Sequence, residues 1–331
     1  MTPTEIQLVF LLLLAVVFDF LNGFNDSANV VATMIASQAM SPRYALMMTA
    51  AAEFCGPLIF GVAVAATIGS EVVSPGAVTT PVVLMALLAA SMWNLVTWFF
   101  GLPSSSSHAL IGGLVGAGVA GSGWQVVHLS GLLKVLIALF ISPFLGFLLS
   151  VVIMRVVIAL CASASPVANV YFKFLQIPTG LALALSHGAN DAQKTMGVIT
   201  LGLVVLGYQK AFHVPLWVIL LSAGAMALGT AIGGWRIIRT LGGKFYRIRP
   251  IHGFVSQFSA MAVVLTASLL GGPVSTSQVV SSAIVGAGAA QRRSQVRWGV
   301  LGEILVAWLL TIPASAGLGA LLYIIYRTVF R

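Results

Sequence analysis

Charged residues are scarce in this sequence. Only 7% of the 331 residues are Asp, Glu, Lys or Arg, whereas 59% are hydrophobic and the mean hydropathy is +1.06. Soluble globular domains carry about 25% charged residues, so the composition excludes an ordinary soluble domain. The sequence also lacks the short segments of alternating hydrophobicity that are typical of a membrane β-barrel. It therefore predicts an all-α, polytopic membrane protein.

Cysteine is also rare, and no basic residue precedes the first apolar run. The two cysteines, Cys55 and Cys161, lie in or beside apolar runs and provide no disulfide framework. The start, MTPTEIQLVFLLLLAVV, has no basic residue before its apolar run, so we expect it to be the first span and not a removed signal peptide. Further apolar runs, alone or with their flanks, are long enough to cross a membrane as helices: 44–69, 79–100, 131–154, 214–235 and 300–326.

The net charge of +9 comes from basic residues that are spread between the apolar runs. This spacing favours a role in membrane orientation over nucleic-acid binding, because cytoplasmic loops are enriched in Lys and Arg. If the four main groups lie inside, the Lys- and Arg-free loop 70–78 lies outside. About ten crossings then follow, with both termini outside. The four groups are Arg43; Arg155 with Lys173; the five basic residues of 236–249; and Arg292, Arg293 and Arg297.

Two motifs occur twice in the same order. GLPSSSSHALIGGLVGAG (101–118) is similar to GGPVSTSQVVSSAIVGAG (271–288), at an offset of 170, and GFND (23–26) is similar to GAND (188–191), at an offset of 165. The near-equal offsets predict a duplication, with residues 1–165 and 166–331 as the two halves of one transmembrane transport domain. Because each half has an odd number of predicted crossings, the halves are expected to be inverted repeats with broken or re-entrant helices.

The GFND and GAND motifs place carboxylates in apolar surroundings. A charged residue at the bilayer centre costs about 2.5–3.5 kcal/mol on insertion scales, so Asp26 and Asp191 need a partner or a function. We expect the motif glycines to break their helices and expose backbone carbonyls. Together with Asn25 and Asn190, the two aspartates would then hold a small coupling cation, either Na⁺ as a metal ligand set or a proton.

The serine-rich motifs suit the opposite charge. Their prolines favour helix starts, where free backbone N–H groups and the helix dipole attract an anion. We therefore predict an oxyanion site, to which Asn25, Asn190 and Lys194 could also contribute. Lys194 could equally pair with Asp191, three residues earlier on the same helix. The predicted hydroxyl donors are Ser104, Ser105, Ser106, Ser107, Ser275, Thr276 and Ser277.

These stretches, with SHGANDAQKTMGVITLGL and RWGVLGEILVAWLLTIPA, resemble the PiT family of inorganic phosphate transporters, particularly its short bacterial Pit-type members. The resemblance spans almost the whole chain. It implies a multi-pass protein of the bacterial cytoplasmic (inner) membrane that is not an enzyme, needs no cofactor and commonly forms a homodimer. It also implies symport of phosphate, free or as a metal-phosphate complex, with Na⁺ or H⁺, in which the residues above hold the ions.

Several alternatives stay open on the residues alone. The family often has other residues at Asn25, Gln257, Ser277-Gln278 and Glu303, so symport of sulfate or another oxyanion is the main alternative. An intramembrane aspartyl hydrolase would also use two aspartates, but it would not explain the paired asparagines or the serine motifs. An ion channel lined by polar groups is the remaining alternative, and it would lack coupled transport.

Overall fold

The computed structural model describes residues 2–71 and 78–330, and these residues form α-helices with no strand among them. The first half contains α1 (Pro3–Ala36), α2 (Pro42–Phe60), α3 (Ala63–Ala66), α4 (Thr80–Phe100), α5 (Ser106–Ser122) and α6 (Leu129–Leu160). The second half contains α7 (Ala168–Val205), α8 (Leu216–Ile232), α9 (Trp235–Gly243), α10 (Pro250–Leu269), α11 (Thr276–Gln291) and α12 (Trp298–Phe330). The predicted all-α fold is confirmed. Within the predicted loop 70–78, residues 72–77 lie outside the described residues.

The N-terminal segment forms a helix from its first residues because its sequence caps that helix. Pro3 occupies the first helical position, and the Thr2 hydroxyl accepts a hydrogen bond from the Glu5 backbone N–H at 3.3 Å. The Glu5 side chain in turn accepts from the Thr2 N–H at 2.8 Å, which completes a capping box. The helix of the predicted first span therefore begins at Pro3 and continues for 34 residues.

Within residues 2–71 and 78–330, five helices are long and apolar enough to cross a membrane: α1, α4, α6, α10 and α12. Two bent pairs, α2 with α3 and α8 with α9, raise this number to seven if each pair is one span. The pairs bend by 76° and 68°, and Gly61 and Gly233 lie at the bends with φ angles of 80° and 77°. Broken helices were predicted, and they are present. The count of ten crossings stays a prediction.

The order of elements is the same in both halves, so that α1 to α6 correspond to α7 to α12. Matching glycines with positive φ support this correspondence: Gly61 with Gly233 at the bends, and Gly101 with Gly271 at the ends of α4 and α10. The halves also pack crosswise, because α5 lies against α12 and α11 lies against α6. The division at 165/166 falls between α6 and α7. The inverted relation of the two halves stays a prediction.

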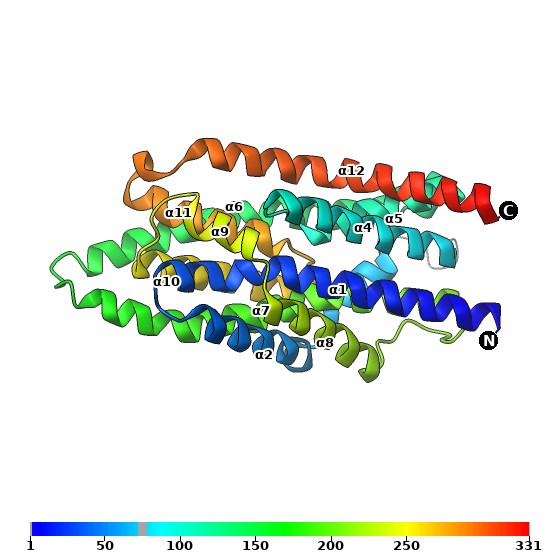
Figure 1. The fold of residues 1–331 in the computed structure, drawn as a ribbon, viewed down its shortest axis with the longest axis horizontal. Helices are drawn as coiled ribbons and strands as arrows, with labels where there is room; N and C mark the ends of the chain where they lie inside the picture. The colour runs from blue at the N-terminus through cyan, green and yellow to red at the C-terminus, as the bar shows by residue number, and fades with distance from the viewer. Residues whose placement is uncertain (1, 72–77, 331) are drawn as a thin grey trace.

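Two helix hairpins enter the protein from opposite ends. In Figure 1, α4 and α5 extend from the end that holds both termini to the middle of the bundle, and α10 and α11 extend from the other end. The turns between their helices are inside the protein, since Pro103, Ser104 and Val274 are buried. The turns also meet, because the Ser107 hydroxyl donates to the Val274 carbonyl at 3.4 Å. These hairpins therefore bring both serine-rich motifs to one place.

The expected helix breaks at the GFND and GAND motifs are wrong. Both α1 and α7 continue without interruption through these motifs. Their glycines instead allow close helix packing, because Gly23 lies against the backbone of Met226 and Gly188 against the backbone of Glu53. A continuous helix satisfies its own backbone hydrogen bonds within lipid, whereas a small residue lets a second helix approach closely. The breaks occur at Gly61 and Gly233 instead.

Most of the basic residues gather at one end of the molecule; Lys134, Lys194, Lys210, Arg327 and Arg331 are outside this group. The connections between α1 and α2, α6 and α7, α9 and α10, and α11 and α12 lie at the end opposite to the two termini (Figure 1). These connections and their flanks hold the four basic groups of the sequence. The grouping agrees with one basic membrane face and with both termini on the opposite face. Which face is cytoplasmic stays a prediction.

The packing of Gly188 gives a test of the fold. A methyl group in Gly188→Ala would overlap backbone atoms of Glu53, and such overpacking costs about 1–3 kcal/mol of stability. We expect a lower thermal unfolding temperature in detergent. Gly302→Ala on α12 is the matched control, since nothing lies within 4 Å of the added methyl group. Equal unfolding temperatures for the two variants would contradict the close contact of α2 with α7.

Candidate functional site

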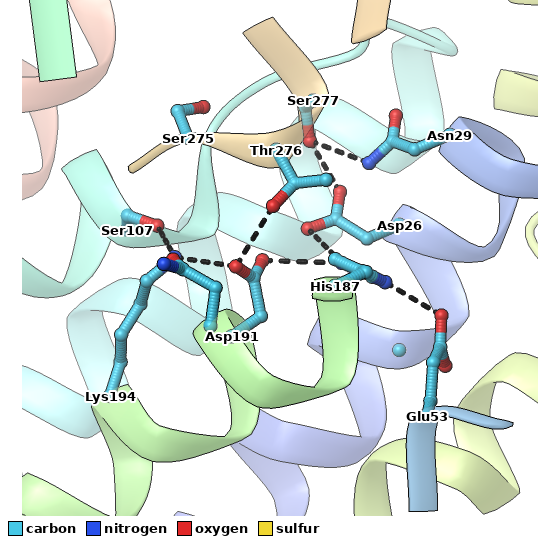
Figure 2. Close-up of polar contacts among 12 residues, drawn as sticks. Asp26, Asn29, Glu53, Ser107, His187, Asp191, Lys194, Ser275, Thr276 and Ser277 are labelled. Carbon is cyan, nitrogen blue, oxygen red and sulfur yellow. Dashed lines mark hydrogen bonds and ion pairs between the residues drawn. The ribbon is translucent and has the colours of Figure 1, made fainter. Parts of the chain in front are cut away.

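Asp26 of α1 and Asp191 of α7 face each other at the centre of the protein, with His187 between them (Figure 2). The His187 Nε2 atom lies 3.3 Å from Asp191 Oδ2 and 3.8 Å from Asp26 Oδ2. One potential ligand atom from each of the three residues lies within 4.8 Å of the others. All three side chains are buried. The structure thus brings the two predicted aspartates together, although their motifs are 165 residues apart.

The second serine-rich motif contacts both aspartates. The Ser277 hydroxyl donates to Asp26 Oδ1 at 2.5 Å, and the Thr276 hydroxyl donates to Asp191 Oδ1 at 3.1 Å. Asn29, one turn after Asp26, donates from its amide to the Ser277 hydroxyl at 3.1 Å. Figure 2 shows this chain of contacts from Asn29 through Ser277 to Asp26. The N-terminus of α11 is therefore tied directly to the carboxylates.

Lys194 connects Asp191 to both hairpins. Its Nζ atom donates to Asp191 Oδ1 at 2.6 Å, to the Ser107 hydroxyl at 2.5 Å and to the Val274 carbonyl at 2.7 Å. An ammonium group has three donors, so all of them are used here. The predicted ion pair with Asp191 is present, and the side chain is only 2% exposed. In this arrangement Lys194 is a fixed countercharge, with no donor left for a further ligand.

The other predicted serines form the hairpin turns. Ser105 and Ser275 are N-caps, because their hydroxyls accept from the backbone N–H groups of His108 and Gln278. Ser104 donates to the Thr97 hydroxyl at 2.8 Å, within the end of α4. Ser106 is the first residue of α5 and is buried. These residues place the two helix N-termini at the centre, while Ser107, Thr276 and Ser277 contact the charged groups there.

The two motif asparagines fasten the hairpins to the central helices. Asn190 donates to the Ser268 hydroxyl at 3.0 Å and to the Gly272 carbonyl at 3.2 Å, and its carbonyl accepts from the Val274 N–H. Asn25 donates to the Asn94 carbonyl at 3.1 Å. These bonds go to the end of α10 and to α4, and none of them joins the carboxylates. Both asparagines thus position the hairpins, while the Asn25 side-chain oxygen has no hydrogen-bond partner. Direct binding of an ion by Asn25 and Asn190 stays a prediction.

Glu53 and His187 are part of the site but were not among the site residues predicted from the sequence. Glu53 Oε1 lies 2.6 Å from His187 Nδ1, and Glu53 Oε2 accepts from the Thr230 hydroxyl at 2.5 Å. Glu53 is an acid within an apolar stretch, and His187 directly precedes the GAND motif. Those two signals marked them as unusual, but their pairing depends on the packing of α2 against α7. Asn29 was also missed, although it has the same position after Asp26 that Lys194 has after Asp191.

The site holds more acidic than basic groups. Asp26, Asp191 and Glu53 meet one ammonium group and one imidazole, so even a fully charged His187 leaves one carboxylate without a countercharge. Such an excess attracts a cation in a region of low dielectric constant. The hydroxyls and helix N-termini of the same site provide donors for an anion. The arrangement can therefore hold ions of both signs next to each other.

Three comparisons relate this chain to known proteins. A family model described as "Phosphate transporter family" matches residues 22–169 and 160–319. A "Probable low-affinity inorganic phosphate transporter" of Rhizobium meliloti (strain 1021) is 45% identical over 318 residues, which cover 96% of this chain and 95% of the relative. A protein of the same description from Bacillus subtilis (strain 168) is 40% identical over 326 residues, which cover 97% of this chain and 98% of the relative.

A solved structure entitled "The sodium-dependent phosphate transporter" is also similar. It superposes with a TM-score of 0.88 and covers 98% of this chain and 99% of its own, at 27% sequence identity. The all-α architecture with bent helices and hairpins is thus that of a solved transporter. The relatives with known descriptions are transporters and not enzymes.

The pair of Lys194 and Asp191 can be tested by two substitutions. Lys194→Met leaves Asp191 buried without its cation, and breaking such a pair costs about 3–5 kcal/mol. We expect a clear fall in the thermal unfolding temperature of the purified protein. The double variant Lys194→Met with Asp191→Asn removes both charges and should recover most of that loss. If the single and double variants unfold at the same temperature, the two residues are not coupled as described.

Proposed function

This chain belongs to the phosphate transporter family, and on that premise we propose that it moves inorganic phosphate together with a small cation, Na⁺ or H⁺. The phosphate is carried free or as a metal complex. The cation binds at the carboxylates of Asp26 and Asp191, and the phosphate binds at the N-termini of α5 and α11. The orientation with both termini outside, the location in a bacterial inner membrane and the homodimer belong to the same proposal.

The cation part of the proposal is supported by the donor atoms at the centre. The carboxylate oxygens of Asp26 and Asp191 and the hydroxyls of Ser277 and Thr276 are hard oxygen ligands, which suit Na⁺. His187 Nε2 lies between the same carboxylates and has no hydrogen-bond partner, so it can instead accept a proton. Both cations therefore remain within the proposal, and the transport experiment below distinguishes them.

The phosphate part is supported by two helix N-termini that point to one place. Ser105 and Ser275 are the N-caps of α5 and α11, and the two hairpins meet where Ser107 donates to the Val274 carbonyl. Free N–H groups at a helix N-terminus and the helix dipole both favour an oxyanion. Lys194 lies between the hairpins and adds a positive charge without being free to move.

The proposed coupling between cation and phosphate binding is based on one observation. The hydroxyls of Ser277 and Thr276 donate to Asp26 and Asp191, and each hydroxyl has only one proton to donate. While the carboxylates hold these donors, the donors cannot serve a phosphate. A cation on the carboxylates competes for the same oxygens, releases the hydroxyls and removes the negative charge that would repel phosphate. Phosphate then binds well only when the cation is present.

Asp26→Asn tests this function because it keeps the shape and an oxygen for Ser277 but removes the charge. In liposomes with an inward cation gradient, the wild-type protein should accumulate phosphate against its gradient. We expect uptake by the variant to fall about tenfold or more, since a charge-assisted hydrogen bond is worth roughly 1.5–3 kcal/mol. Wild-type uptake by the variant would contradict the role of Asp26. Ser281→Ala, a buried residue one turn beyond Ser277 on α11, is the matched control.

The same liposomes separate the alternatives. Imposing a Na⁺ gradient and a pH gradient in turn identifies the coupling cation. Competition by sulfate at the concentration that saturates phosphate uptake would favour a broader oxyanion symporter. Dissipation of a phosphate gradient without any accumulation would indicate a channel and would contradict coupled transport.

A further inference from the structure

Asp19 is a buried acid outside the central site. It lies on α1, seven residues before Asp26, which places it on the same face about 10 Å away. Its side chain is fully buried. Oδ1 accepts a hydrogen bond from the Thr195 hydroxyl of α7 at 2.5 Å, whereas Oδ2 has no hydrogen-bond partner.

The surroundings of Asp19 provide oxygen atoms but no cationic side chain. The Ser222 hydroxyl of α8 lies near the carboxyl group of Asp19 and has no hydrogen-bond partner. Asn22, one turn further along α1, also has an unpaired side-chain carbonyl. Among the described residues, no Lys, Arg or His forms an ion pair with Asp19, and the charged group that acts on it is Asp191. The carboxyl group therefore has neutral oxygen neighbours and one acidic neighbour.

A purely structural role does not require an acid at this position. An Asn side chain would accept the same hydrogen bond from Thr195 without the cost of a carboxylate in lipid. Buried carboxylates in membrane proteins usually mark ion or proton pathways. Oδ2 is the atom of Asp19 that is left without a partner and is therefore available to a further ligand.

The position of Asp19 connects it to the central site. Asp19, Asn22 and Asp26 follow one face of α1, and Asp191 and Thr195 follow one face of α7, at helical spacing. The two faces are in contact at two places: Thr195 donates to Asp19, and His187 lies next to Asp26. A row of polar side chains thus leads from Asp19 to the central carboxylates. α1 begins at the end that holds the termini (Figure 1), and Asp19 precedes Asp26 along this helix, so Asp19 lies nearer to that end.

We propose that Asp19, Thr195 and Ser222 form a second cation site, which receives the coupling cation before it reaches Asp26. This inference rests on the proposed function. The ligand is a small monovalent cation: a Na⁺ ion held by the carboxylate and the hydroxyl oxygens, or a proton on Oδ2. The site suits a cation and not phosphate, because it contains a carboxylate and hydroxyl oxygens but no cationic side chain.

Asp19→Asn is the decisive variant because it preserves the acceptor for Thr195. In proteoliposomes we would measure the initial uptake of phosphate against Na⁺ concentration at fixed pH, and against pH at fixed Na⁺. Exchange of phosphate without net cation flow is measured in the same vesicles. We expect exchange to continue, while the cation concentration for half-maximal uptake rises about tenfold. A shift in the Na⁺ series identifies a sodium site, and a shift in the pH series identifies a proton site.

Unchanged cation dependence in both series would overturn the proposal. Failure of the proposed function is distinguishable, since the wild-type protein itself would then show no cation dependence. If Asp19→Asn does not fold, Ser222→Ala is used as the test. We expect the cation concentration for half-maximal uptake to rise about threefold, because one hydroxyl ligand is lost. An unchanged Ser222→Ala protein would then overturn the site. Ser259→Ala is the control, because its buried hydroxyl bonds only within its own helix, to the Val255 carbonyl.

Discussion

The structure depends on one electrostatic constraint: carboxylates that lie inside a membrane protein need partners. Asp26, Asp191 and Glu53 are all buried, and each has a partner on another helix: Ser277 for Asp26, Thr276 for Asp191 and His187 for Glu53. Meeting this constraint requires close helix packing: Gly188 lets α7 approach α2, and Gly23 lets α1 approach α8. It also requires both hairpin turns to reach the centre. The positions of the helices and the chemistry of the site thus have the same physical cause.

The two halves share the order of their helices, but they contribute different groups to the site. The residue three positions after each motif aspartate contacts the hairpin of the other half. Asn29, after Asp26, contacts Ser277 of α11, and Lys194, after Asp191, contacts Ser107 of α5. The glycine of one motif packs on Met226, and that of the other packs on Glu53. One half therefore uses neutral groups where the other half uses charged ones. As a result, Asp191 has a permanent countercharge, whereas Asp26 has only hydroxyl and imidazole neighbours, and the need for a mobile cation is greatest at Asp26.

Local sequence patterns were sufficient for some of these features. The composition predicted the all-α membrane fold, and the duplicated motifs predicted that Asp26, Asp191 and the serines belong together. The patterns failed where packing between distant helices decides the outcome. The motif glycines were expected to break helices, but α1 and α7 continue, because the glycines serve helix contact. Glu53 and His187 could not be paired from sequence, since their contact depends on how α2 lies against α7. Asn190 bonds to Ser268 of α10 and to the Val274 N–H, contacts that the sequence did not indicate, and its role as an ion ligand stays a prediction.

The central claim is that a cation on the carboxylates frees the hydroxyls for phosphate, so the two ions must strengthen each other's binding. Titration calorimetry of phosphate into the purified protein measures this linkage directly, with the cation present at saturation and then replaced. Na⁺ would be replaced by choline in one series, and the pH would be raised in the other. Because coupling between sites is reciprocal, we predict that phosphate binds about tenfold more tightly in the presence of the coupling cation. The same affinity for phosphate under all these conditions would contradict the account.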